Sequence, residues 1–133
     1  MKTQASRLVA AVLFSLGGLA EAAQTISSAA IPVTTLPDNL ACYVRNIGDK
    51  PVSVTVQIVN SSGAVVSPAF QNCNGAPLAA GRTCVVLVSA VTNDLFACSA
   101  TASGSAKNLR GTMELRRSLF GGGVEVEAAD DLR

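Results

Sequence analysis

The fold is decided by residues 52–58, which read Val52-Ser-Val-Thr-Val-Gln-Ile58. Apolar side chains occupy every second position, and polar side chains occupy the positions between them. Successive side chains of a β-strand point to opposite faces, so this alternation is typical of a strand with one face buried and the other in water. Turn-forming residues follow, in Asn60-Ser-Ser-Gly63. We therefore expect a half-buried strand that ends in a turn.

The same pattern extends in both directions along the chain. Further strands are predicted at residues 40–45, 84–90, 95–101 and 109–115, with weaker ones at 31–35 and 64–66. Residues 84–90 are almost all apolar, which favours a central strand, and no segment past residue 30 has a long helical period. Short strands separated by Gly, Pro and Asn turns predict an all-β fold, an antiparallel sandwich of about seven strands.

The first residues have the layout of a secretory signal. Lys2 and Arg7 carry positive charge, Leu8–Leu19 is uncharged and apolar, and Ala20-Glu21-Ala22 places small residues at a cleavage site. A membrane-spanning helix needs about 20 apolar residues, so this run is too short to anchor the chain. We expect a cleaved signal peptide over residues 1–22 and an exported protein, periplasmic or extracellular, without stable membrane insertion after cleavage. The alternative is a buried N-terminal helix.

The chain beyond residue 22 is formally neutral. The ten Lys and Arg residues less Lys2 and Arg7 leave eight, and the nine Asp and Glu residues less Glu21 also leave eight. Neutrality argues against nucleic acid as a partner, because that binding depends on neutralising phosphates. We divide the remainder into a lead-in and possible first strand (23–37), a sandwich domain (38–120) and a polar acidic tail (121–133). The tail is expected to be either mobile or an edge strand.

Four cysteines, at positions 42, 73, 84 and 98, lie in the exported part. Export places them where disulfides persist, and three pairings are possible. Cys42 and Cys98 each share a strand face with apolar residues, whereas Cys73 and Cys84 flank a loop rich in turn residues. We favour Cys42–Cys98, as the inter-sheet disulfide of an immunoglobulin-like sandwich, and Cys73–Cys84 as a local closure. A zinc site is disfavoured, since the chain has no histidine and no CxxC spacing.

Three short motifs resemble those of immunoglobulin-like domains in bacterial exported proteins. They are Asn46-x-Gly48, Leu78-Ala-Ala-Gly-Arg-Thr-Cys84 and Leu109-Arg-Gly-Thr-Met-Glu-Leu115. The layout is also similar to that of a group of small, uncharacterised bacterial secreted proteins, and the resemblance covers about residues 40–116. Ala80 stands where the turn of those domains usually has proline, and the chain has no core tryptophan. The resemblance implies the fold and no catalytic residues.

Catalytic chemistry has little support in the sequence. The usual general base, histidine, is missing. Lys50 and Lys107 could in principle assist a serine, but both lie among turn residues and are expected to be solvated. Asp130 and Asp131 are adjacent, but they lie in the polar tail. We therefore predict no enzyme activity, no cofactor and no metal site.

Two groups of side chains are candidates for contact with a partner. An outward tyrosine beside an arginine, Tyr43 and Arg45, could form a binding hot spot, although plain surface is favoured. Arg110, Arg116 and Arg117, with Lys107, form a basic patch on the last predicted strand of the sandwich. This patch could meet an acidic partner or a glycan, or it could protect a sheet edge, and edge protection is favoured.

Three functions follow from these observations. The first is a non-catalytic exported module that binds a protein or a cell-envelope component. The second is a pilin-like subunit that assembles by strand donation. The third, with least support, is a small hydrolase or inhibitor.

Overall fold

The computed structural model describes residues 22–34, 38–90, 93–118 and 123–133. They contain nine β-strands and no helix, so the all-β prediction is confirmed. The predicted signal peptide lies outside these residues apart from Ala22. The strands are β1 (Gln24–Ser27), β2 (Ile31–Pro32), β3 (Asp38–Asn46), β4 (Val54–Asn60), β5 (Phe70–Gln71), β6 (Thr83–Ala90), β7 (Leu95–Ala102), β8 (Leu109–Ser118) and β9 (Val124–Leu132).

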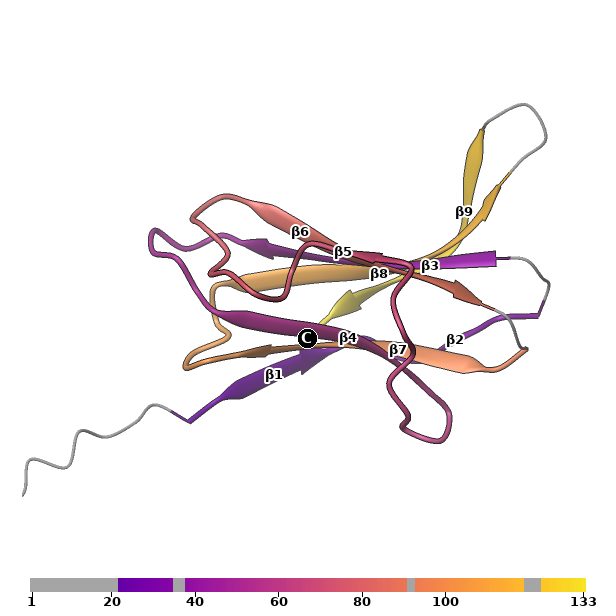
Figure 1. Cartoon of the computed structure of the whole chain (residues 1–133), viewed down its shortest axis with the longest axis horizontal. Coiled ribbons are helices and arrows are strands. Elements are labelled where there is room, and N and C mark those ends of the chain that lie inside the picture. The colour runs from indigo at the N-terminus through magenta and orange to yellow at the C-terminus, as the bar shows by residue number, and fades with distance from the viewer. Residues whose placement is uncertain (1–21, 35–37, 91–92, 119–122) are drawn as a thin grey trace, which may run out of the picture.

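The strands form two antiparallel sheets packed as a sandwich (Figure 1). One sheet has the order β5-β6-β3-β8-β9. In the other, β7 pairs with β4 along one edge and with β1 and β2 in succession along the other. The predicted sandwich is therefore confirmed, with more strands than the seven expected.

The core lies between the sheets and is built by the alternation seen in the sequence. Cys42 in β3 and Cys98 in β7 are fully buried and joined by a disulfide that ties one sheet to the other, with a Cα–Cα distance of 6.1 Å. Cys73 and Cys84 form the second disulfide, at a Cα–Cα distance of 4.9 Å. Both predicted pairings are confirmed. The largest fully buried side chains include Leu40, Ile58, Leu109, Met113, Val33, Val44, Val56 and Val88.

The structure corrects two predicted strands, and it places a strand in the segment predicted as a lead-in and possible first strand. The lead-in contains a strand, β1, whose residues pair with β7, and Ile26 packs against the core. The strand predicted at 64–66 is reduced to a bridge between Val59 and Val65. Val52 lies outside β4, because its main chain exchanges hydrogen bonds of 3.1 and 2.8 Å with Leu78 instead of continuing the β7 ladder. Local alternation cannot reveal the β1–β7 and Val52–Leu78 pairings, since each joins residues distant in sequence.

Asn46, 1% exposed, connects two turns at the end of β3. Its Nδ2 donates to the carbonyl oxygens of Lys50 (2.7 Å) and Leu78 (3.0 Å), and its Oδ1 accepts from the N–H of Gly48 at 2.9 Å. Its own carbonyl accepts from the N–H of Gly81 at 2.8 Å. Gly81 has φ of 72°, a left-handed conformation that glycine adopts without strain. The Asn46-x-Gly48 and Leu78–Cys84 motifs are therefore parts of one hydrogen-bonded unit.

The outer edge of β4 is occupied by other parts of the chain. The side-chain amide of Asn74 accepts from the N–H of Val56 at 2.9 Å and donates to its carbonyl at 3.2 Å, as a neighbouring strand would. Farther along, the N–H of Val66 donates to the carbonyl of Ile58 at 2.9 Å. Such coverage blocks the addition of a strand from another chain at this edge.

β8 and β9 form a long hairpin whose far end projects beyond the two layers (Figure 1). The register shifts between Leu115 and Arg116, because Leu115 pairs with Ala128 and Arg116 pairs with Val126. The extra residue in β9 is a β-bulge, which bends the strand and changes which face the following side chains occupy. Val126 therefore shares the face of Arg116, and it is largely exposed.

Candidate binding face and end pocket

The outer face of the five-stranded sheet carries a mixture of apolar, aromatic and charged side chains. Tyr43 lies between two core-facing residues, Cys42 and Val44, so it points to the opposite, outer face. Register places Val85 and Thr112 directly beside Tyr43. We call this surface the tyrosine face, and its residues, aligned across β5, β6, β3 and β8, are Phe70, Leu87, Val85, Tyr43, Thr112, Glu114 and Arg116; Ala41 shares the face but is fully buried.

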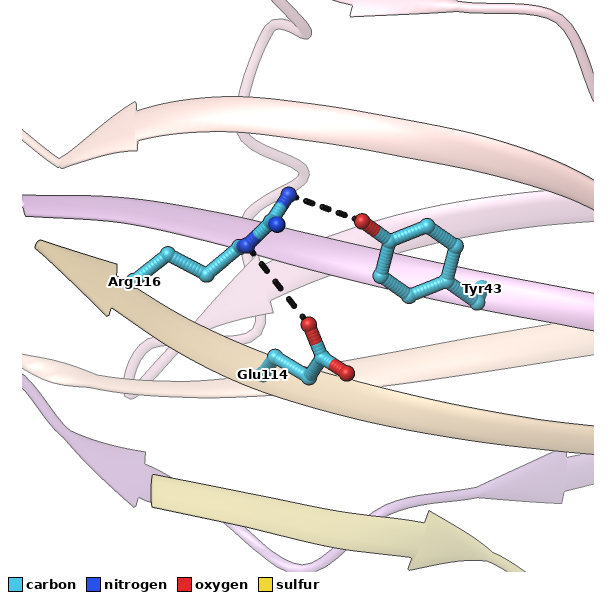
Figure 2. A network of polar contacts seen from close by, with 3 residues as sticks. All are labelled: Tyr43, Glu114 and Arg116. Atoms are coloured by element: carbon cyan, nitrogen blue, oxygen red, sulfur yellow. Dashed lines mark hydrogen bonds and ion pairs between the residues drawn. The ribbon is translucent and has the colours of Figure 1, made fainter. Parts of the chain in front are cut away.

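Arg116 is held in place on this face by two neighbours (Figure 2). Its Nη1 donates to the hydroxyl of Tyr43 at 2.8 Å, and its Nε lies 3.6 Å from Oε2 of Glu114. The guanidinium carbon is 6.0 Å from the centre of the Tyr43 ring, within the range of a cation–π contact. Tyr43 and Arg116, both predicted as contact residues, are thus brought together, and the arginine is held in one orientation before any partner arrives.

Arg45 and Arg110 are directly opposite each other in the β3–β8 ladder. Like charges in this position repel, so the pair is unfavourable for the sheet itself. Arg110 is held by the start of β8 and the turn before it, since its Nη1 donates to the carbonyl oxygens of Leu109 at 2.7 Å and Lys107 at 2.9 Å. Both arginines are exposed. The structure therefore brings two predicted contact residues together as a concentrated positive site.

A depression of about 980 Å³, which we call the end pocket, adjoins this pair. Of the eight basic residues that follow residue 22, four line it, whereas Asp131 is its one acidic lining residue among the residues that the structure describes. Asp131 accepts a hydrogen bond of 3.2 Å from the hydroxyl of Thr112. The pocket is therefore positive, although residues 23–133 together carry no net formal charge. The four basic lining residues are Arg45, Lys107, Arg110 and Arg133.

The predicted basic patch does not form as one surface. Arg117 alternates with Arg116, so it points to the other face of β8. Arg110 and Arg116 share a face, but six residues of strand, about 20 Å, separate them. β9 pairs with β8 from Gly111 to Ser118, so Arg116 and Arg117 do not lie at a sheet edge and their interpretation as edge protection is wrong, whereas Arg110 lies just before the paired stretch.

Sequence reasoning missed several residues of this site. Phe70, 51% exposed, belongs to a two-residue strand too short to produce an alternation. Val85 and Leu87 are the outward positions of β6, and the parity of Cys84 could have identified them. Arg133 reaches the end pocket through the pairing of β9, which the sequence left undecided.

Other ionisable and apolar features lie away from this face. Hydrogen bonds hold the pKa of Asp94 below its ordinary value of 3.8, chiefly one from the Ser61 side chain and then one from the N–H of Leu95. Within the described ranges, no group of three or more Cys, Asp or Glu side chains is arranged to hold a metal ion. Over the same residues, no helix has the length and apolar character needed to cross a membrane.

The arrangement can bind a surface or an extended ligand through three features. They are the apolar side chains of Phe70, Leu87 and Val85, the fixed guanidinium of Arg116 and the positive end pocket. Comparison with known proteins found no protein-family model, no curated protein and no solved structure that matches the chain.

Proposed function

We propose that the chain is a non-catalytic, exported binding module with an immunoglobulin-like sandwich. Its partner is a protein or a cell-envelope component, and its contact surface is the tyrosine face with the adjoining end pocket. The observation that carries the proposal is the fixed Tyr43–Arg116 pair on the same sheet face as the exposed Phe70. Arginine, tyrosine and other aromatic residues are enriched where proteins bind partners. Side chains that are already fixed before binding lose less conformational entropy when the partner binds.

Export is supported by the two disulfides and by the signal-like N-terminal sequence. Disulfides are rare in the reducing cytosol and persist in the periplasm and outside the cell. A fold that depends on them suits a protein that works after export.

Pilin-like assembly is the alternative. In that case the subunit lacks a strand and receives one from its neighbour. The occupied outer edge of β4 weighs against it, since Asn74 and Val66 already take the hydrogen-bonding positions that a donated strand would use. A small hydrolase or inhibitor has no arrangement of side chains in its favour among the described residues.

Site-specific crosslinking in the native host tests the binding function. A photoreactive amino acid replaces Phe70 on the tyrosine face, and in a second strain it replaces Val65, which is 59% exposed beside the other sheet. We expect a discrete crosslinked species from position 70 that mass spectrometry identifies, and none of the same mass from position 65. The two positions match in exposure and apolar character, so the comparison isolates location.

Arg116→Gln provides the second arm of this test. It removes the guanidinium that Tyr43 and Glu114 hold, on the surface of the sheet and outside the core. We expect the position 70 crosslink to weaken while the protein remains folded and oxidised. Equal crosslinking from both positions, or from neither under several growth conditions, would contradict the proposal.

A further inference from the structure

The end pocket lies in the gap between the edge of β1 and the edge of β8. At one end of this gap β9 runs between them, because Leu132 pairs with Gly111 of β8 and Arg133 exchanges main-chain hydrogen bonds of 3.0 and 3.1 Å with Ser27 of β1. The gap is therefore wide enough there for one extended strand. Lining residues from both strands, Thr25 of β1 and Leu109 of β8, continue it into the pocket.

The β1 wall of the pocket presents a main chain that is ready to pair. The N–H of Ser28 donates to Cys98 in β7, whereas Ser27 turns its N–H and carbonyl away, toward Arg133. These directions alternate along an antiparallel strand. The N–H and carbonyl of Ile26 therefore point toward β7, and those of Thr25 point into the gap. Thr25 has no strand partner on that side among the residues that the structure describes, and it is exposed.

The β8 wall offers charge instead of a pairing edge. The N–H of Leu109 donates to the carbonyl of Ala106 at 2.9 Å, and the carbonyl of Leu109 accepts from Arg110. Both main-chain groups are occupied, and the guanidinium that occupies one of them is itself positive. Arg45, Lys107 and Arg133 add to this charge around the same depression.

We propose that the end pocket binds an extended acidic peptide segment of a partner protein, which adds to β1 at Thr25 and directs its carboxylates to Arg45 and Arg110. This inference rests on the proposed binding function and names the chemistry of the partner. Main-chain pairing supplies affinity in strand addition, and side-chain contacts supply specificity. Guanidinium groups bind carboxylates in a bidentate manner, so a peptide with Glu or Asp at alternate positions matches this wall.

A free main-chain edge distinguishes a peptide from an acidic sugar as the occupant. An oligosaccharide would use the arginines and leave the N–H of Thr25 unpaired, because sugars do not form a β-ladder. Exchange of the Thr25 amide proton therefore reports which ligand class the pocket takes.

The test titrates the oxidised, exported protein with the acetylated peptide Glu-Thr-Glu-Val-Glu-Thr-Glu and follows amide exchange by NMR. We expect Thr25 to exchange rapidly in the free protein and about tenfold or more slowly at saturation, as expected for an amide that enters a ladder. The matched peptide with Gln at each Glu position is expected to bind more weakly. Methylation of the peptide nitrogens that face β1 is expected to abolish the protection of Thr25.

Protein variants distinguish binding by the arginines of the end pocket from attraction to positive charge anywhere on the protein. Arg45→Gln and Arg110→Gln are each expected to weaken peptide binding by about two- to fivefold, the range for exposed ion pairs. Arg82→Gln removes the same charge from an exposed position that does not line the pocket, and it is expected to leave binding unchanged.

Three results would overturn the inference. They are no binding of the acidic peptide, binding without protection of Thr25, and binding of tetragalacturonate in preference to the peptide. Crosslinking at Phe70 is a separate measurement, so a partner captured there while the peptide fails would remove this inference and leave the proposed function standing.

Discussion

Replacement of Asn46 by alanine should cost far more stability than its position at the end of a strand suggests. Asn46→Ala removes three hydrogen bonds, to Lys50, Leu78 and Gly48, and leaves their main-chain groups without this partner. A hydrogen bond contributes about 1 to 1.5 kcal/mol, so the three together predict a loss of about 3 to 4.5 kcal/mol. Water can reach part of this unit, so the upper figure is a limit.

Asn60→Ala is the matched control. The Asn60 side chain also makes three hydrogen bonds, all as acceptor, from the N–H groups of Ser62 and Ala64 and from the Ser62 hydroxyl, but all three are exposed. Water replaces exposed partners, so we expect a loss of under about 1 kcal/mol. The residue type and the number of bonds are the same in both variants; Asn46 donates two of its bonds and Asn60 accepts all three, but the difference in burial is the one expected to set the loss.

Denaturant unfolding of the oxidised protein, followed by circular dichroism, measures both variants. The midpoint should fall strongly for Asn46→Ala and slightly for Asn60→Ala, with the slope unchanged, because the surface exposed on unfolding is the same. Equal losses would refute the reasoning, since they would mean that burial of Asn46 does not set the strength of its bonds.

Three further predictions concern the core, the cross-link and pH. Gly111→Ala places a Cβ 2.8 Å from the carbonyl oxygen of Tyr43 in β3, so we expect a loss of about 1 to 3 kcal/mol of stability in the same unfolding assay, and full stability would show that β8 can move away from β3. Replacement of both Cys42 and Cys98 by alanine should lower the free energy of unfolding by about 4 kcal/mol, because this disulfide closes a long loop. Removal of the Cys73–Cys84 disulfide, which closes a shorter loop, should cost less, and an equal or larger loss there would contradict this estimate. The pKa of Asp94 is lower in the folded protein than in the unfolded chain. Its ionised carboxylate should therefore stabilise the fold above about pH 4, and this stabilisation should be lost as the pH falls through the pKa of the folded protein. Asp94→Asn should therefore make the free energy of unfolding depend less on pH below about pH 4. An unchanged pH dependence would contradict the role given to the hydrogen bonds of Asp94.

The cysteine pairing shows how far residue parity reaches. Cys42 and Cys98 could be assigned from the sequence because each sits at an inward position of a strand with a strong alternating pattern. The same logic places Tyr43 and Arg45 outside. It also separates Arg116 and Arg117, because neighbours on a strand point to opposite faces, so the prediction of one basic patch that contains both is wrong.

Strand pairing between segments that are far apart in the sequence is the part of the fold that a local sequence pattern does not reveal. The sequence predicts a lead-in and a possible first strand over residues 23–37, since Gln24–Ser27 lacks a clear apolar face, and β1 forms there because β7 offers it an edge. Residues 121–133 left two alternatives open, and β9 forms there because β8 is long enough to pair with it. Phe70 escaped notice for the same reason, since β6 makes its short segment a strand.

Alternating apolar residues and four thiols were sufficient by themselves to determine a two-layer β fold with its two cross-links, because burial of one strand face is a local property of the chain. The sequence also determined that Tyr43, Arg45 and Arg110 face outward. Only the tertiary structure decided that Arg45 lies opposite Arg110, that Arg116 binds Tyr43, and that β1 and β8 flank a positive pocket. Those contacts depend on strand order and register, which are set by the packing of residues far apart in the chain.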